Sequence, residues 1–209
     1  MPQPVVNAIR DHLDLELYSG GYEAAAIAAA AVHKFYHSLA QLLHTQARNI
    51  AFATNATDAY SRALLSIPFK KGDVILTTAD DYVSNQVAFL QLQKRFGVQL
   101  LRAKVTESGG LDVADMLQLI EQHQPRLVAV THVPTSSGLV QAVAEIGKVC
   151  QEKEIWYLVD ACQSAGQMPL NVNEISCDFL SATFRKFMRG PRGAGFLYVS
   201  DRVLEEGLE

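Results

Sequence analysis

From residue 50 onward, short apolar runs alternate with amphipathic stretches, and this alternation constrains the fold more than any other feature of the sequence. Seven runs have the length and composition of strands, at 50–54, 73–78, 98–103, 127–132, 155–160, 178–182 and 195–199. Helix-length segments separate most of them, at 57–68, 82–95, 111–122 and 140–153. The pattern predicts an α/β fold with a mostly parallel open sheet of about seven strands and helices on both faces. Only a loop joins the last two runs, which allows one of them to run antiparallel.

The first 47 residues have a different pattern. Apolar residues recur at helical spacing from Val5 to Leu17, Gly20 and Gly21 interrupt that helix, and an alanine-rich stretch continues to about Gln46. The sequence therefore predicts a single domain with three parts, which are N-terminal helices (1–47), an α/β core (48–200) and the start of a truncated C-terminal segment (201–209).

Charge and hydropathy exclude several classes of partner. The 209 residues include 18 basic and 22 acidic ones, and no run of lysine or arginine predicts a nucleic-acid surface. The most apolar stretch, at 24–32, is far shorter than the roughly 20 residues that cross a bilayer. The N-terminus lacks the pattern of a secretory signal, so we expect a cytoplasmic protein whose partner is a small molecule.

The three cysteines, Cys150, Cys162 and Cys177, follow no metal-binding spacing and are odd in number. Neither a disulfide framework nor a zinc site is indicated, and no metal is expected. We interpret them as free, mostly buried thiols.

Ligands of open α/β sheets bind beyond the carboxyl ends of the strands, where helix N-termini offer backbone N–H groups. The segments at these ends therefore hold the candidate site residues. They are 54–57, 81–82, 132–138, 160–163 and 183–186.

Asp160 ends the apolar run at 155–159, so its carboxylate is predicted to project from the end of a central strand. Burial would raise the pKa of this carboxyl unless a cation or a donor paired with it. A protonated pyridine nitrogen is one such partner. The alternative, which is the commoner role for an isolated aspartate here, is a cap on the following helix.

Lys186 follows a predicted strand and is flanked by Phe187 and Met188. Desolvation there would lower the pKa of the amine and make it nucleophilic toward an aldehyde, whereas the alternative is a solvated loop lysine. Thr183 and Arg185 add a hydroxyl and a guanidinium that suit a phosphate dianion.

Thr57 opens a predicted helix, where its hydroxyl and the amides of Ala56 and Thr57 could meet the same phosphate. The alternative for 54–58 is an N-cap alone, and the two interpretations are compatible.

Two motifs at a fixed distance from Lys186 are more specific than any single residue. Asp-x-x-Gln-x-x-Gly spans 160–166, and Gly-Pro-x-Gly-x-Gly spans 190–195. With this combination the chain resembles the class V aminotransferase family of fold-type I pyridoxal 5′-phosphate (PLP) enzymes. That family includes cysteine desulfurases, selenocysteine lyases and isopenicillin N epimerase-like proteins.

The resemblance implies a role for each matching residue. Lys186 falls on the Schiff-base lysine, Asp160 on the aspartate that holds the pyridinium nitrogen, and Gln163 on the glutamine that bonds the phenolic oxygen of PLP. Thr57 and Thr183 fall on phosphate-binding hydroxyls.

Three positions depart from the family pattern. Tyr82 stands where relatives often stack a histidine on the ring, and a tyrosine can stack equally well. Arg185 stands where desulfurases usually have histidine, and Thr135 stands where many relatives have asparagine near the phenolic oxygen. His132 ends a predicted strand, and the sequence leaves open whether it is a core residue or a site residue.

The resemblance further implies a homodimeric enzyme that acts on an amino acid by transamination, epimerisation, or cleavage of a sulfur or selenium amino acid. Family members continue into a C-terminal small domain with a carboxylate-binding arginine and, in desulfurases, a nucleophilic cysteine. We therefore expect the PLP-binding large domain only, with the small domain absent. A catalytically incomplete PLP-binding or interaction domain is the alternative. A dinucleotide-binding domain is disfavoured, because no G-x-G-x-x-G follows the first strand.

Overall fold

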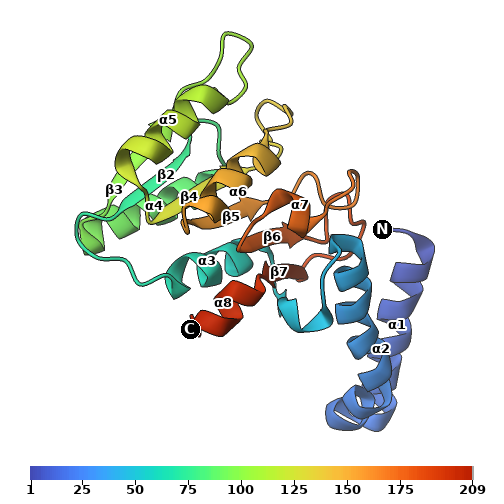
Figure 1. Ribbon diagram of the computed structural model, residues 1–209. Coiled ribbons are helices and arrows are strands. Elements are labelled where there is room, and N and C mark those ends of the chain that lie inside the picture. Colours follow the sequence, from blue (N-terminus) through green and yellow to red (C-terminus); the bar gives the residue numbers. More distant parts are fainter. Residues whose placement is uncertain (209) are drawn as a thin grey trace.

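A seven-stranded sheet runs through the middle of the computed structural model, which describes residues 1–208 (Figure 1). Its strands are β1 (Ile50–Ala53), β2 (Val74–Thr78), β3 (Gln99–Ala103), β4 (Leu127–Thr131), β5 (Trp156–Asp160), β6 (Phe179–Thr183) and β7 (Gly195–Val199). They lie in the order β1-β7-β6-β5-β4-β2-β3. Strand β7 pairs antiparallel with both β1 and β6, and the other pairs are parallel. The predicted, mostly parallel α/β sheet is confirmed, and β7 is its antiparallel strand.

The helices of residues 1–208 are α1 (Gln3–Ser19), α2 (Gly21–Leu43), α3 (Ala56–Ser66), α4 (Val83–Phe96), α5 (Val113–His123), α6 (Val143–Glu152), α7 (Val172–Ile175) and α8 (Asp201–Glu206). A short 3-10 helix, Ala47–Asn49, precedes β1. The alanine-rich helix ends at Leu43, a few residues earlier than predicted, because His44 adopts a left-handed conformation. No helix within residues 1–208 is long and apolar enough to span a membrane.

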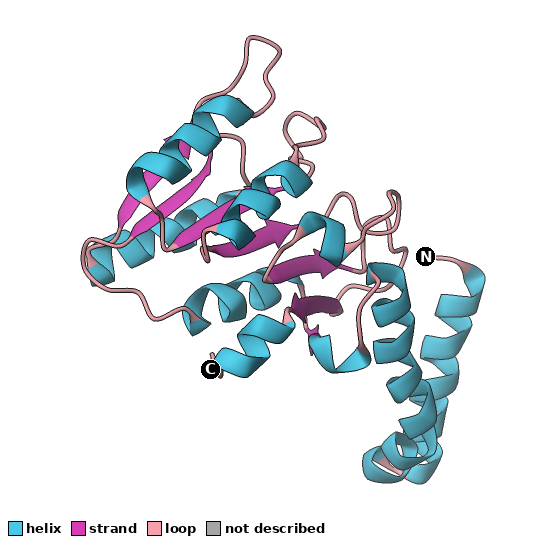
Figure 2. Ribbon diagram, viewed as in Figure 1, coloured by secondary structure: helices cyan, strands magenta, loops and turns pink. Residues whose placement is uncertain are grey.

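The sheet has a hydrophobic core on each face, and β5 contributes to both. Trp156 and Leu158 belong to the cluster with α3 and α4, whereas Tyr157 and Val159 belong to the cluster with α5 and α6. Helices cover both faces in Figure 2. A strand buried on both faces reads as one continuous apolar run, which explains the sequence pattern before Asp160. Asp160, the first polar residue after this apolar run, therefore lies at the carboxyl end of β5.

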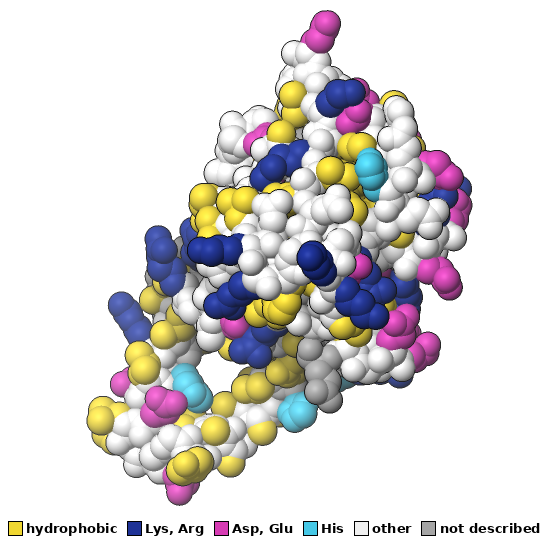
Figure 3. Space-filling model, turned by 90° about the vertical axis from the view of Figure 1, so that its left-hand side faces the viewer, with side chains coloured by type: hydrophobic (Ala, Val, Ile, Leu, Met, Phe, Trp, Pro, Cys, Tyr) yellow, Lys and Arg dark blue, Asp and Glu magenta, His cyan; other side chains and the backbone are white. Residues whose placement is uncertain are grey.

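Helices α1 and α2 form a hairpin that projects away from the sheet (Figure 1). Helix α1 buries no side chain, and Leu17 and Tyr22 are 74% and 92% exposed. The hairpin forms the lower lobe in Figure 3, where hydrophobic side chains are spread over its surface. Only the C-terminal end of α2 packs on the core, through Leu39 and Leu43.

Two leucines of α4 provide a matched test of this packing. Leu92 is 4% exposed and packs from α4 into the core that α3 and the sheet share, whereas Leu90 is 50% exposed. Leu92→Ala is expected to lower the free energy of unfolding by about 2–5 kcal/mol, because it leaves a cavity in the core. Leu90→Ala is expected to change it by about 0.5 kcal/mol. Urea unfolding measures both, and equal losses would contradict the packing.

Candidate active site

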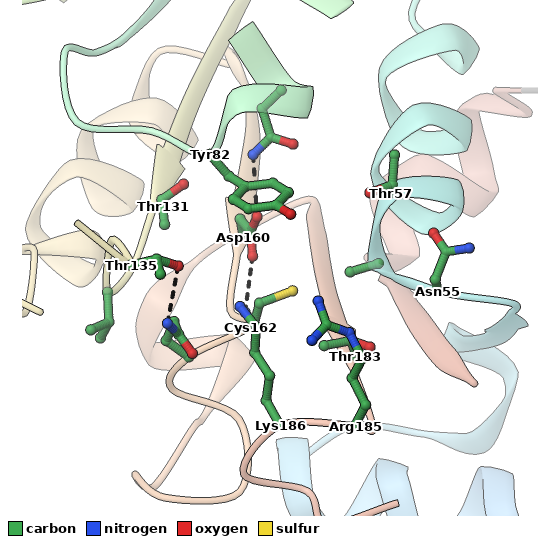
Figure 4. Close-up of a pocket in the computed structure, with 14 residues that line it drawn as sticks. Asn55, Thr57, Tyr82, Thr131, Thr135, Asp160, Cys162, Thr183, Arg185 and Lys186 are labelled. Carbon is green, nitrogen blue, oxygen red and sulfur yellow. Dashed lines mark hydrogen bonds between the residues drawn. The ribbon is translucent and has the colours of Figure 1, made fainter. Parts of the chain in front are cut away.

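A cavity lies at the carboxyl ends of β4, β5 and β6, beside the N-terminus of α3 (Figure 4). It brings together all nine sequence-predicted site residues, which are Ala56, Thr57, Tyr82, Thr135, Asp160, Gln163, Thr183, Arg185 and Lys186. Five further residues line it, namely Asn55, Asn85, Thr131, Val133 and Cys162. Five separate segments of the chain therefore meet at the carboxyl ends of the strands.

Asp160 lies at the back of the cavity and is 5% exposed. Its Oδ1 atom accepts a hydrogen bond from the Cys162 backbone N–H at 2.9 Å, and its Oδ2 atom accepts one from the Asn85 side-chain amide at 3.2 Å. Each oxygen of this buried carboxylate therefore accepts a hydrogen bond from within the protein. The Cys162 bond is a local turn contact, and the predicted alternative of a helix cap is wrong, because the next helix is α7 and its N-cap is Asn171. A carboxylate has further lone pairs, which can accept from a group in the cavity.

Lys186 reaches the cavity from the loop after β6, and Figure 4 shows its side chain extending toward Cys162 and Asp160. Gly166 sets this position. Its φ is +90°, and a Cβ atom there would lie 2.7 Å from the backbone of Phe187 and Met188. Only glycine therefore lets the 160–166 loop pack this closely against the Lys186 loop. The Lys186 Nζ atom lies 5.8 Å from the centroid of the Tyr82 ring.

A corner of the cavity is suited to a dianion. Thr57, Thr183 and Arg185 lie together on one side of it in Figure 4. The backbone N–H groups of Ala56 and Thr57 begin α3, and no hydrogen bond within residues 1–208 uses them. Among the same residues, neither Arg185 nor Lys186 forms a salt bridge. Unpaired cations and a helix N-terminus together attract anions.

Gly195 brings the N-terminus of α3 into this corner. A Cβ atom on Gly195 would lie 2.8 Å from the Asn55 carbonyl carbon and 2.9 Å from the Ala182 oxygen. Asn55 itself caps α3, because its side-chain oxygen accepts from the Asp58 N–H at 2.9 Å. The N-cap interpretation of 54–58 is thus confirmed, with Asn55 as the capping residue.

The other side of the cavity carries neutral donors and acceptors. The side-chain amide of Gln163 donates to the Thr135 hydroxyl at 3.0 Å, so these two predicted site residues are paired. Tyr82 is 41% exposed, and its ring lies above Asp160 in Figure 4. The cavity is therefore cationic on one side and neutral on the other, with a carboxylate at the back and an aromatic ring above it.

Sequence reasoning missed Asn85, which donates to Asp160. Its spacing was the available signal, because Asn85 follows Tyr82 by three residues at the start of a helix, and residues three apart share a helix face. A buried amide on the same face as a site residue was therefore a candidate.

All three cysteines are free and buried, as predicted. Cys162 nevertheless lines the cavity. Burial, followed by the nearby Asp160 charge, raises the pKa of its thiol well above the usual range. Because the thiolate is the nucleophile, Cys162 is not an activated cysteine at neutral pH.

His132 does not line the cavity. It is 6% exposed, and its Nδ1 atom lies 3.0 Å from the Ser164 hydroxyl. Burial lowers the pKa of the imidazole, which favours the neutral ring. The structure therefore favours the interpretation of His132 as a core histidine at a strand end.

The fold and the cavity define an α/β protein with a lysine and a cationic corner at the carboxyl ends of its strands. The model of the aminotransferase class-V family matches residues 1–207, and the chain belongs to this family. The resemblance expected from the two sequence motifs is thus confirmed.

Curated relatives and solved structures agree with this assignment. A probable cysteine desulfurase of Pyrococcus abyssi is 30% identical over 98% of the chain and 52% of its own length. The apo structure of a cysteine desulfurase from Thermococcus onnurineus NA1 has a TM-score of 0.87 and 29% identity, over 98% of this chain and 52% of that one. The cystine C-S lyase C-DES, solved with its product cysteine persulfide, has a TM-score of 0.90 and 25% identity, over 99% and 56%. The chain spans about half the length of these proteins.

Proposed function

We propose that this chain is the PLP-binding large domain of an enzyme that acts on an amino acid, with Lys186 as the residue that binds the cofactor covalently. The convergence of Lys186 and the buried Asp160 in one cavity carries the proposal. A solved mutant of C-DES holds glycine covalently linked to its PLP cofactor, and its fold matches this chain with a TM-score of 0.90.

The polar groups of the cavity fit the three polar parts of PLP. Arg185, Thr183 and the unpaired N–H groups of α3 suit the phosphate. The Asp160 carboxylate can accept from a protonated ring nitrogen, and it has two donors that already stabilise its charge. Gln163 and Thr135 suit the phenolic oxygen, because each can donate to it.

When bound, PLP supplies an electron sink for the electrons released at the α-carbon of an amino acid. The residues of this chain provide the rest. Asp160 keeps a proton on the ring nitrogen, and the Tyr82 ring covers the cavity. The Lys186 amine, once released from the cofactor, is placed to take up and return a proton at the substrate α-carbon.

Sulfur amino acids are the proposed substrate class, because the relatives reported above are cysteine desulfurases and a cystine lyase. None of Cys150, Cys162 and Cys177 is proposed as a sulfur-accepting nucleophile, because burial raises the pKa of all three thiols. The predicted homodimer and cytoplasmic location stay predictions.

A second candidate is a PLP-binding domain that does not turn over an amino acid by itself. The observation that favours it is the length of the chain, which covers 52% of its P. abyssi relative. Release of sulfide, persulfide or a keto acid from cysteine or cystine separates the two candidates. Turnover that Lys186→Ala abolishes supports the enzyme, whereas PLP binding without turnover supports the second candidate.

The cofactor step can be tested with Lys186→Ala. Wild-type protein mixed with PLP is expected to develop a visible absorbance band, and Lys186→Ala is expected to lack it, because the covalent link to the amine is gone. Lys148→Ala removes an exposed lysine of α6 and is the matched control, which should retain the band. A band of equal intensity in Lys186→Ala, or none in the wild type, would overturn the proposal.

The phosphate corner can be tested with Arg185→Ala. The variant is expected to bind PLP about 10–100-fold more weakly, because a charge-assisted contact with the phosphate is lost. Its affinity for pyridoxal, which lacks the phosphate, should change by less than about threefold. Arg192→Ala, in the same loop and exposed, is the control. Fluorescence titration measures both affinities. An equal loss of affinity for PLP and for pyridoxal would show that Arg185 does not contact the phosphate.

A further inference from the structure

Asp81 is a second carboxylate close to Asp160, and the cofactor contacts proposed above do not use it. It follows β2, is partly buried and does not line the cavity. Its Oδ1 atom accepts from the Thr131 hydroxyl, from the Tyr82 N–H at 2.6 Å and from the Asn85 amide at 3.0 Å. Its Oδ2 atom accepts from the Thr77 hydroxyl and the Gln86 amide, each at 3.3 Å. Five donors from three elements thus converge on one side chain.

Asn85 connects the two carboxylates. It is 3% exposed, and its Nδ2 atom donates to Asp81 at 3.0 Å and to Asp160 at 3.2 Å. Because both neighbours accept, the amide nitrogen and not the oxygen must face them. Without Asp81, the side chain would be free to rotate, and its oxygen could then face the Asp160 carboxylate, where two acceptors repel.

The far side of Asp81 is also held in place. Gln86 donates to Asp81 through Nε2, and its Oε1 atom accepts from Arg102 at 2.7 Å. The Arg102 bonds fix the orientation of the Gln86 amide, just as the two carboxylates fix that of Asn85. A continuous chain of hydrogen bonds therefore runs from Arg102 on β3, through Asp81, to Asp160.

We propose that Asp81 is a positioning residue, which holds Asn85 so that the Asn85 amide orients the Asp160 carboxylate toward the ring nitrogen of PLP. The same carboxylate holds the backbone N–H of Tyr82, the residue whose ring covers the cavity. This inference rests on the proposed function. Asp81 orients the Asp160 carboxylate through Asn85 and does not contact the cofactor itself.

The first test needs no cofactor. In ligand-free wild-type protein, the side-chain amide protons of Asn85 are expected to exchange slowly with solvent, because both are bonded and buried. In Asp81→Ala they are expected to exchange at least tenfold faster. Asp81→Asn retains one acceptor oxygen and the shape of the side chain, and it should restore part of the protection. Unchanged exchange in Asp81→Ala would overturn the inference.

The second test measures the protonation of the PLP ring nitrogen by NMR, with nitrogen-15 in the ring of the cofactor. The ring nitrogen resonance of bound PLP is expected at the protonated position in the wild type and shifted toward the unprotonated position in Asp81→Ala. PLP affinity should fall about tenfold, because the orientation of one charge-assisted contact is lost. Asp80→Ala removes the adjacent, half-buried carboxylate, which accepts from Ser136 and not from Asn85, and it should leave both readouts unchanged.

The double variant Asp81→Ala/Asn85→Ala tests whether Asp81 acts through Asn85. If it does, the double variant should match Asn85→Ala alone, whereas additive shifts would contradict the inference. If the wild type develops the Lys186-dependent band but Asp81→Ala leaves the ring-nitrogen signal unchanged, the inference about Asp81 is overturned and the proposed function stands. A wild type without a Lys186-dependent band would overturn the proposed function and the cofactor role of Asp81 with it.

Discussion

A buried carboxylate at the end of the central strand is the constraint on which this site depends. Removing a charge from water is costly unless donors surround it, and Asp160 has two, from its own loop and from α4. Asp160 lies at the end of β5 because the apolar residues of this strand fill the cores on both faces of the sheet, and this packing fixes where the strand ends. The parallel register then sets Thr131 and Ser181 beside Asp160 on the neighbouring strands.

The remaining groups are arranged around this carboxylate by close backbone contacts. Gly166 lets the Lys186 loop pack on the Asp160 loop, and Gly195 lets the start of α3 approach β6. These contacts place Arg185 on one side of the cavity, and they place the neutral hydrogen-bonding pair Gln163 and Thr135 on the other. A ligand with a dianion, a ring nitrogen and a phenolic oxygen matches that distribution, and a simple anion would use only one corner.

Local pattern predicted most of the fold, because strands of this sheet are short and apolar and are separated by long amphipathic helices. The direction of β7 depends on its partners, which the sequence does not display. Helices α7 and α8 have four and six residues, too few for a helical period to emerge. The segments that hold the nine site residues could be predicted because the carboxyl ends of parallel strands meet at one edge. Within these segments, the family resemblance singled out Tyr82, Thr135 and Gln163. Asn85 was missed, although it follows Tyr82 by three residues, because only the folded chain shows its bond to Asp160, 75 residues away.

The most direct test of the account is to trap the cofactor on the chain. Borohydride reduction of the PLP-loaded protein, followed by peptide mapping, identifies which of its eight lysines carries the pyridoxyl group. Lys186 is expected to carry the pyridoxyl group in stoichiometric yield. Modification of another lysine, or of several in partial yield, would contradict it.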